Sequence, residues 1–380
     1  MKRRFIFVWA FMLLILILLP PLQASAADDW SSEVLLNEFN GTILGFDDSR
    51  IIWKETGDKV LWLYNRTDGS EVKVYDATGS DYTIHSAKLS TEGVVFTLSI
   101  ADSSTWPPYR HSVYYWNDGN VRNLADGPSP YGDVYEVKGN FALFTNRVLD
   151  LVTEQSRSLP NSNFVNTNRF DLSADGTVVY TDPTTRSNLY KSLPDGTMTT
   201  LVLPSGYISY SGPLMDGTNM IYQVLKSYSS GYKWLVRLRD ADDNITTLAL
   251  NPFYSYIFNP RPYYQINNGW IAYKEYNKEK DNWSLYIRSP EGETKPIFET
   301  PSQTWKQSWY ARDGISINQL GPDGSVVYTV RYGKLNYTKT YLYSTQSDTH
   351  VRVSSGKEFQ YRNGAWYRMT SNSLFAIQVQ

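Results

Sequence analysis

One pattern recurs along the chain from Arg50 to Gln380: a short apolar strand, a polar loop, a second apolar strand, a turn that contains glycine, and a third strand. It is clearest at 177–203 and returns at 325–353. Self-similarity at a period of roughly 40–50 residues is typical of a β-propeller, in which each repeat forms one blade of a ring. No linker or charge run divides the chain, so the sequence predicts an all-β structure with a single propeller domain at 27–380.

The unit at 170–203 shows how a blade is read from the sequence. Four strands, a to d from the inside outward, are predicted at 170–172, 178–180, 188–191 and 198–203, with Asp-Gly turns after strands a and c. Glycine suits these turns because tight hairpins require a positive φ, which costs glycine little. The same reading places strand b eight times, near 50–54, 94–98, 141–145, 177–181, 220–225, 270–274, 325–331 and 365–369.

The last unit is one strand short, because the chain ends at Gln380 just after its strand c. An apolar stretch at 33–38, which contains Val34, Leu35 and Leu36, precedes the first unit. Pairing the two chain ends in one blade would remove two exposed sheet edges. We therefore expect residues 33–38 to complete the last blade of an eight-bladed ring. Seven blades is the alternative, because the unit at 141–159 is short.

Two units carry a motif that resembles a known repeat family. Residues 172–177 read Leu-Ser-Ala-Asp-Gly-Thr and are followed by Val-Val-Tyr, and 321–325 read Gly-Pro-Asp-Gly-Ser before another Val-Val-Tyr. The downstream pattern Leu-Tyr-x(4)-Asp-Gly occurs at 189–196. These motifs resemble the blades of TolB-type, WD-repeat-like propellers. The resemblance implies the fold and says little about activity, since one fold serves unrelated functions.

The first 26 residues have the pattern of an export signal. Lys2, Arg3 and Arg4 precede an apolar run at 5–19, and Ala24-Ser25-Ala26 fits a cleavage site. We expect a signal peptide at 1–26 and a protein that is secreted or associated with the cell wall, with no stable membrane insertion after cleavage. An uncleaved anchor is the alternative, although a spanning helix needs about 20 apolar residues.

The amino-acid composition limits the compartment in which the protein works and the kinds of partner it can have. The chain has no cysteine, so an exported protein of this sequence depends on burial and backbone pairing rather than disulfides. This favours a bacterial protein. Removal of the three basic residues of the signal takes the formal net charge from −2 to −5. Such a charge does not suggest a nucleic-acid partner, which would call for a basic face.

The loops predict which face of the ring binds. The a–b and c–d connections are short turns on one side, here called the turn face, whereas the b–c and d–a connections are long and lie on the other side, the long-loop face. Binding commonly resides on the more elaborate loops, and aromatic side chains suit sugar rings or protein partners. Packing between blades is the alternative for each of them. The predicted ligand-binding residues on the long-loop face are Trp106, Tyr109, Tyr228, Tyr232, Tyr254, Tyr256, Trp305, Trp309 and Tyr310.

No catalytic residue, metal site or cofactor is predicted. The three histidines, His85, His111 and His350, are expected in separate units, so a three-histidine metal site is disfavoured. The motifs of a serine-hydrolase nucleophile, a P-loop and a dinucleotide site are missing. The acidic run at 240–244 is interpreted as a turn, with a Ca²⁺ site as the alternative. Acids in or near the long loops suggest no particular pair: Asp102, Asp133, Asp182, Glu279 and Glu299.

The leading hypothesis is a non-enzymatic, extracellular propeller that binds a polysaccharide or a protein through its long-loop face. The main alternative is a carbohydrate-active enzyme, a glycoside hydrolase or a lyase, with paired carboxylates in the central funnel. A third possibility is a sensor or scaffold module that acts with a membrane partner.

Overall fold

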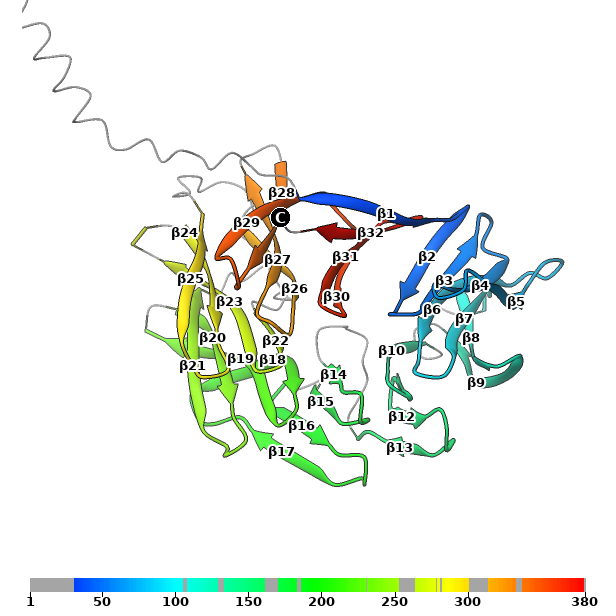
Figure 1. Cartoon of the computed structure of the whole chain (residues 1–380). Helices are drawn as coiled ribbons and strands as arrows, with labels where there is room; N and C mark the ends of the chain where they lie inside the picture. The colour runs from blue at the N-terminus through cyan, green and yellow to red at the C-terminus, as the bar shows by residue number, and fades with distance from the viewer. Residues whose placement is uncertain are drawn as a thin grey trace, which may run out of the picture.

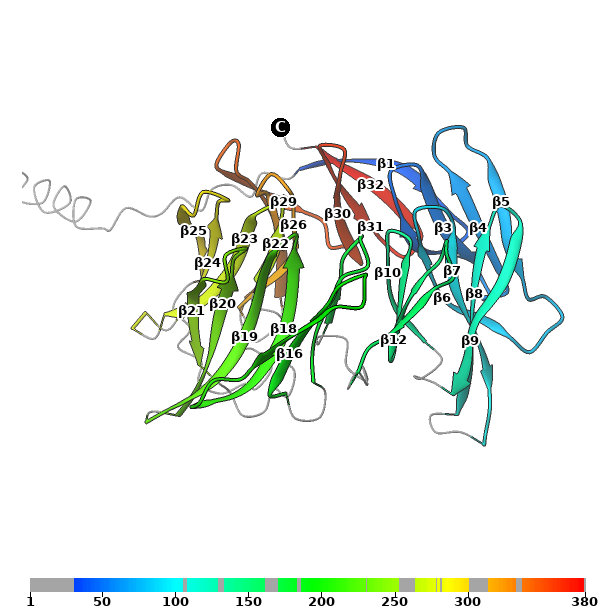
Figure 2. The ribbon, with the colours of Figure 1, turned by 90° about the horizontal axis from the view of Figure 1, so that it is seen from below.

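The computed structural model describes residues 31–378 except 105–107, 129–132, 161–169, 183–185, 230, 253–263, 278, 281, 301–313 and 333–336. The described residues form no helix, and hence none that could cross a membrane. Eight four-stranded antiparallel sheets stand around a common axis, which makes the chain an eight-bladed β-propeller, as predicted (Figure 1). The side view shows the blades packed face to face (Figure 2).

In the first four blades the strands run from the axis outward in chain order. Blade 1 comprises β2 (Gly41–Phe46), β3 (Arg50–Glu55), β4 (Val60–Asn65) and β5 (Glu71–Asp76); blade 2 comprises β6 (Thr83–Leu89), β7 (Val94–Ala101), β8 (Tyr109–Asn117) and β9 (Asn120–Pro128); blade 3 comprises β10 (Val134–Lys138), β11 (Phe141–Phe144), β12 (Arg147–Asp150) and β13 (Ser156–Ser158); blade 4 comprises β14 (Phe170–Leu172), β15 (Val178–Thr181), β16 (Asn188–Ser192) and β17 (Met198–Val202).

The next three blades repeat this order, and the last blade departs from it by taking its outer strand from the N-terminal end of the domain. Blade 5 comprises β18 (Tyr207–Asp216), β19 (Asn219–Tyr228), β20 (Gly231–Arg239) and β21 (Ile245–Pro252); blade 6 comprises β22 (Tyr264–Asn267), β23 (Trp270–Asn277), β24 (Asn282–Arg288) and β25 (Thr294–Glu299); blade 7 comprises β26 (Ile315–Leu320), β27 (Val326–Tyr332), β28 (Tyr337–Ser344) and β29 (Thr349–Val353); blade 8 comprises β30 (Glu358–Arg362), β31 (Ala365–Met369), β32 (Ser373–Gln378) and β1 (Ser32–Glu38).

An aromatic pair recurs at the middle of five of the eight blades, where strand b faces strand c. In blade 4, Tyr180 lies directly opposite Tyr190, and their ring centroids are 5.0 Å apart. Aromatic cross-strand pairs of this kind stabilise a sheet beyond their buried area. The equivalent pairs are Trp53 with Trp62, Phe96 with Tyr114, Tyr273 with Tyr286, and Tyr328 with Tyr341, at 5.3 to 6.2 Å.

The apolar core consists of layers between neighbouring blades rather than one central mass. Blades 1 and 2, for example, enclose Ile52, Leu61, Val94 and Phe96, all fully buried. Similar clusters fill the gaps between the other neighbours around the ring. Each blade therefore buries both of its faces, and its stability depends on the blade on either side.

The glycine of the Asp-Gly motif has a packing role as well as a turn role. Gly176 has a φ of 85°, and a Cβ added to it would lie 2.7 Å from the ring of Phe141 in the preceding blade. Gly324 repeats this geometry against Trp270, at 2.5 Å. Any larger residue would thus be strained in its own turn and would clash with the neighbouring blade.

β1 closes the ring. It pairs antiparallel with β32, from Ser32 opposite Gln378 to Glu38 opposite Ser373, as predicted for residues 33–38. Glu33 fixes the junction from a nearly buried position. Its carboxylate accepts hydrogen bonds from Nε and Nη2 of Arg368 in β31, at 3.1 and 2.5 Å, and from the backbone N–H of Ser354, at 3.0 Å. One side chain therefore joins β1 to blade 8 and to the segment that follows blade 7.

We expect Glu33→Gln to destabilise the ring, because it leaves the buried Arg368 guanidinium without its counter-charge. Loss of one partner of such a pair costs about 3 kcal/mol of unfolding free energy. Chemical denaturation followed by tryptophan fluorescence would measure it. The control is Asp76→Asn, which breaks the exposed Lys73–Asp76 pair and should leave the unfolding free energy nearly unchanged. Equal stability of Glu33→Gln and the wild type would contradict this role for Glu33.

Candidate functional site

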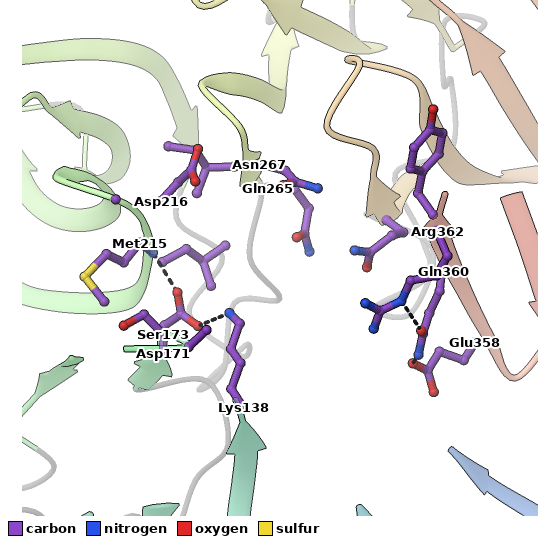
Figure 3. A pocket seen from close by; sticks show the side chains of 16 residues that line it. Lys138, Asp171, Ser173, Met215, Asp216, Gln265, Asn267, Glu358, Gln360 and Arg362 are labelled. Carbon is purple, nitrogen blue, oxygen red and sulfur yellow. Dashed lines mark hydrogen bonds and ion pairs between the residues drawn. The ribbon is translucent and has the colours of Figure 1, made fainter. Parts of the chain in front are cut away.

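A cavity of about 590 Å³ lies among the innermost strands of six blades. The residues that line it come from the ends of these strands that lead into the a–b turns, so the cavity lies on the turn face. Side chains from blades 3 to 5 face those of blade 8 across it (Figure 3). Its polar lining side chains are Lys138, Asp171, Ser173, Asp216, Gln265, Asn267, Gln319, Glu358, Gln360, Tyr361 and Arg362.

The alternation of the inner strands explains why so many polar groups meet here. In β30, Glu358, Gln360 and Arg362 line the cavity, whereas Phe359 between them is buried against the neighbouring blades. In β22, Gln265 lines the cavity beside the fully buried Tyr264, although Ile266 and Asn267 at the end of the strand line it as well. Because successive side chains of a strand point to opposite faces, one set reaches the axis and the other fills the core.

Two aspartates of the cavity wall connect consecutive blades. The Oδ2 atom of Asp171 in β14 accepts a hydrogen bond from the backbone N–H of Met215 in blade 5, at 2.7 Å. The Oδ2 atom of Asp216 accepts one from the N–H of Gly269 in blade 6, at 2.6 Å. These carboxylates are therefore held in fixed positions and have a structural use of their own.

Asp171 also belongs to a charged group with Glu136 and Lys138 of β10. Its Oδ1 atom lies 3.8 Å from Nζ of Lys138. Burial, reinforced by the charge of Asp171, raises the pKa of Glu136 to about 7, against the opposing effect of Lys138. Burial also raises the pKa of Asp171, while Lys138 and the Met215 N–H oppose the shift. Near neutral pH Glu136, which lies behind the lining residues Lys138 and Asp171 and does not itself line the cavity, can therefore give or take a proton.

The opposite wall is a chain of hydrogen bonds along β30. Nε2 of Gln360 donates to Oε1 of Glu358 at 2.5 Å, and Nε of Arg362 donates to Oε1 of Gln360 at 3.2 Å. Together with Gln265 and Asn267 these groups offer both donors and acceptors (Figure 3), and Gln319 adds another amide. The cavity can therefore satisfy a ligand with many hydroxyl groups better than one with a single strong charge.

The predicted aromatic residues are only partly within the described chain. Tyr109 begins β8 and Tyr232 lies at the start of β20, and both are about half exposed at the long-loop face. Tyr228 ends β19 and is partly buried against the blade 4–5 core. The structure brings Tyr228 and Tyr232 together on one hairpin and places Tyr109 on blade 2. Outside the described residues lie Trp106, Tyr254, Tyr256, Trp305, Trp309 and Tyr310.

The expectation that the three histidines occupy separate units is wrong for two of them. His85 lies in β6 and His111 in β8 of the same blade, with ring centroids 4.7 Å apart. β8 begins early, at Tyr109, so His111 belongs to strand c of the blade that contains His85. His111 Nδ1 also contacts Oδ1 of Asp133. Burial and the neighbouring His111 lower the pKa of His85. No group of three His, Asp or Glu residues in the described part of the chain is arranged to hold a metal ion.

The acidic run at 240–244 forms the turn between β20 and β21, as interpreted. Oδ1 of Asp240 accepts hydrogen bonds from the N–H groups of Asp242 and Asn244, at 3.0 and 2.9 Å. Asp243 pairs instead with Arg239. The carboxylates are thus used within the turn itself.

The carboxylates of the cavity are not the loop acids considered from the sequence. Asp133 contacts His111, Asp102 accepts from Ser104, and Glu299 pairs with Lys280. None of these three lines the cavity. A usable signal was the alternation of polar and apolar residues in the inner strands, most clearly at 358–362.

Comparisons with known proteins bear on the fold alone. No protein-family model and no curated protein matches the chain. A solved structure described as the eukaryotic initiation factor is 8% identical, with a TM-score of 0.50 over 91% of this chain and 89% of that one. The propeller domain of the Trilobed protease from Pyrococcus furiosus is 13% identical, with a TM-score of 0.43 over 79% of this chain and 94% of that one. An oligogalacturonate lyase in complex with manganese is 11% identical, with a TM-score of 0.39 over 91% of this chain and 79% of that one. The first likeness shows the fold alone, and the other two are too distant to support an argument.

The pKa of Glu136 predicts a pH dependence of stability. The folded protein keeps the Glu136 proton up to about pH 7, whereas a free glutamate has a pKa of 4.5. The native state therefore binds more protons between these values, and the Glu136 contribution to the unfolding free energy falls as pH rises from 4.5 to about 7. Glu136→Gln should remove that decline, at most about 3 kcal/mol. Urea titrations of both proteins across this range would measure it, and identical slopes would contradict the prediction.

Proposed function

We propose that the chain is an exported binding protein without catalytic activity of its own, and that the cavity on the turn face holds part of a polysaccharide. The observation that carries this proposal is the lining: amide, carboxyl and basic side chains from six blades converge on one space of about 590 Å³. A site of this size accommodates a few sugar units.

The side chains that line the cavity suit a sugar better than a peptide. Gln265, Gln319 and Gln360 each offer both donors and acceptors, as hydroxyl groups require. Leu214 and Tyr361 add apolar surface for the C–H faces of a sugar ring. The inter-blade hydrogen bonds of Asp171 and Asp216 keep the walls in place before a ligand arrives, which lowers the entropic cost of binding.

Export to the cell surface or the medium, proposed from the pattern of residues 1–26, would bring such a site to extracellular polysaccharides. The long-loop face, with its predicted aromatic residues, is the alternative position for the ligand or for a protein partner. Binding at the two faces can be separated by mutation, because the cavity and the long loops share no residue.

Gln265→Leu combined with Gln319→Leu should weaken binding of the recognised polysaccharide at least about tenfold, since each variant removes hydrogen bonds and leaves hydroxyl groups unsatisfied. A glycan array probed with residues 27–380 would identify the ligand, and calorimetry would give the affinities. The matched control is Gln155→Leu with Gln346→Leu, because both of these glutamines are exposed away from the cavity. If the cavity variant binds normally while Trp106→Ala, Trp305→Ala and Trp309→Ala do not, the ligand lies on the long-loop face instead.

A second function is favoured by one specific observation, the pKa of Glu136 near 7 beside the Asp171 carboxylate. A carboxyl group whose pKa lies near 7 and that has a second carboxyl group close by can act as the general acid of a glycoside hydrolase. If the chain is such an enzyme, purified protein should release reducing ends from the bound polysaccharide. Glu136→Gln should then lower the rate at least about a hundredfold without weakening binding. Release of no reducing ends over a day would leave binding as the function.

A further inference from the structure

Blade 5, like blades 3 and 8, lacks the aromatic pair that blades 1, 2, 4, 6 and 7 share. At the position where Tyr180, Tyr273 and Tyr328 each face another aromatic ring, Tyr222 faces Arg237. Arg237 is partly buried, and its guanidinium lies 4.7 Å from the ring centroid of Tyr207 in β18. Its Nε atom is buried without a hydrogen-bond partner. In blade 5 a cation therefore lies where five other blades place an aromatic ring.

Two lysines stand next to each other in the same blade. Lys226 of β19 and Lys233 of β20 are directly opposite in the sheet register. Like charges at such positions destabilise a sheet, because the side chains lie only about 5 Å apart at their Cβ atoms. The pairing of Lys226 with Lys233 is therefore expected to lower the stability of blade 5.

Tyrosine rings hold these cations in place. Nζ of Lys226 lies 5.0 Å from the ring centroid of Tyr207 and 5.4 Å from that of Tyr228. Nζ of Lys233 lies 5.3 Å from the ring of Tyr228. Cation–π contacts offset part of the repulsion without neutralising the charge. Lys226, Lys233 and Arg237 with Tyr207 and Tyr228 are here called the blade 5 row.

The blade 5 row has no acidic partner among the described residues. None of its three cations forms an ion pair with a described carboxylate, whereas Lys280 pairs with Glu299 and Lys295 with Asp348. The next arginine along β20, Arg239, is neutralised by Asp243. Three fixed positive charges thus lie together in a chain whose formal net charge is negative. Charge complementarity calls for an anion at this place.

The row lies at the long-loop end of the blade, since β18 begins at Tyr207, β19 ends at Tyr228, and β20 begins at Gly231. Tyr232, about half exposed, is at the tip of the same hairpin. Tyrosines beside cations suit a ligand with apolar ring faces, hydroxyl groups and regularly spaced anionic groups. We propose that the blade 5 row binds an anionic polysaccharide. This second surface is independent of the cavity and does not require that the cavity binds anything.

The test compares Lys226→Gln combined with Lys233→Gln against the wild-type chain, residues 27–380. With alginate as the probe, the variant should bind about 30-fold more weakly, the loss expected from two charge-assisted contacts. The same variant should unfold at an equal or higher temperature, since the repulsion between the two lysines is removed. The charge-matched control, Lys280→Gln with Lys295→Gln, should bind alginate normally. An unchanged affinity in the row variant, or an equal loss in the control, would overturn the proposal.

Three further probes define the ligand class. The propylene glycol ester of alginate, in which most carboxylates are masked, should bind much more weakly than alginate. If it binds equally, the charges are not used and the proposal fails. If polyglutamate or polyphosphate of similar length binds as tightly as alginate, the row recognises charge alone and the assignment to a polysaccharide is wrong. The cavity variant Gln265→Leu with Gln319→Leu should keep its alginate affinity at the row, whatever its effect on the cavity ligand.

Discussion

Closure of the ring is the constraint on which the rest of the structure depends. Every blade buries both faces against its neighbours, so an open ring would expose two sheet faces and the edge of β32. The structure meets this constraint with a strand from the other end of the domain and with the Glu33–Arg368 pair, which is nearly inaccessible to water. The cavity depends on this closure. Its two walls lie in blades 3 to 5 and in blade 8, which are distant in sequence and face each other only in a complete ring.

The regular parts of this fold could be predicted from the sequence because each depends on local chemistry. Asp-Gly at 175–176 and at 195–196 predicts a turn, and Gly176 and Gly196 have the positive φ values that such turns need. The apolar strand before each polar loop gave strand b in all eight blades. The completion of the last blade by residues 33–38 could also be predicted, by counting the strands. The cavity could not be predicted in this way, since Lys138, Asp171 and Gln360 are brought together only by the ring. The pKa of Glu136 likewise depends on burial in the assembled ring and on a carboxylate 35 residues away in the next blade.

The register of the strands reveals contacts that the amino-acid composition cannot show. Lys226 and Lys233 are seven residues apart and look like ordinary surface lysines in the sequence. Only the hairpin that pairs them directly shows that they repel each other. In the same way, the polar residues of β30 look like a solvated strand until the sheet is placed innermost, where Glu358 and Arg362 face the axis. The predicted preference for the long-loop face came from loop length, whereas the described cavity comes from strand alternation on the other face.

The two surfaces proposed for this chain use opposite electrostatic strategies. In the cavity, acidic side chains (Asp171, Asp216 and Glu358) and basic ones (Lys138 and Arg362) occur together. Two of the acidic ones already bind the scaffold, Asp171 through the N–H of Met215 and Asp216 through the N–H of Gly269. Such groups can orient a neutral ligand. A charged ligand would bind them weakly, because the cost of removing it from water would exceed the interactions it gains. In the blade 5 row the charges have one sign, and tyrosine rings hold them without neutralising them. That arrangement favours an anion that reaches it from solvent. A polysaccharide that contains both neutral and acidic sugars could therefore bind at both faces of the ring. Binding at two sites would raise its overall affinity only if the stretch of polysaccharide between them can pass around or through the ring.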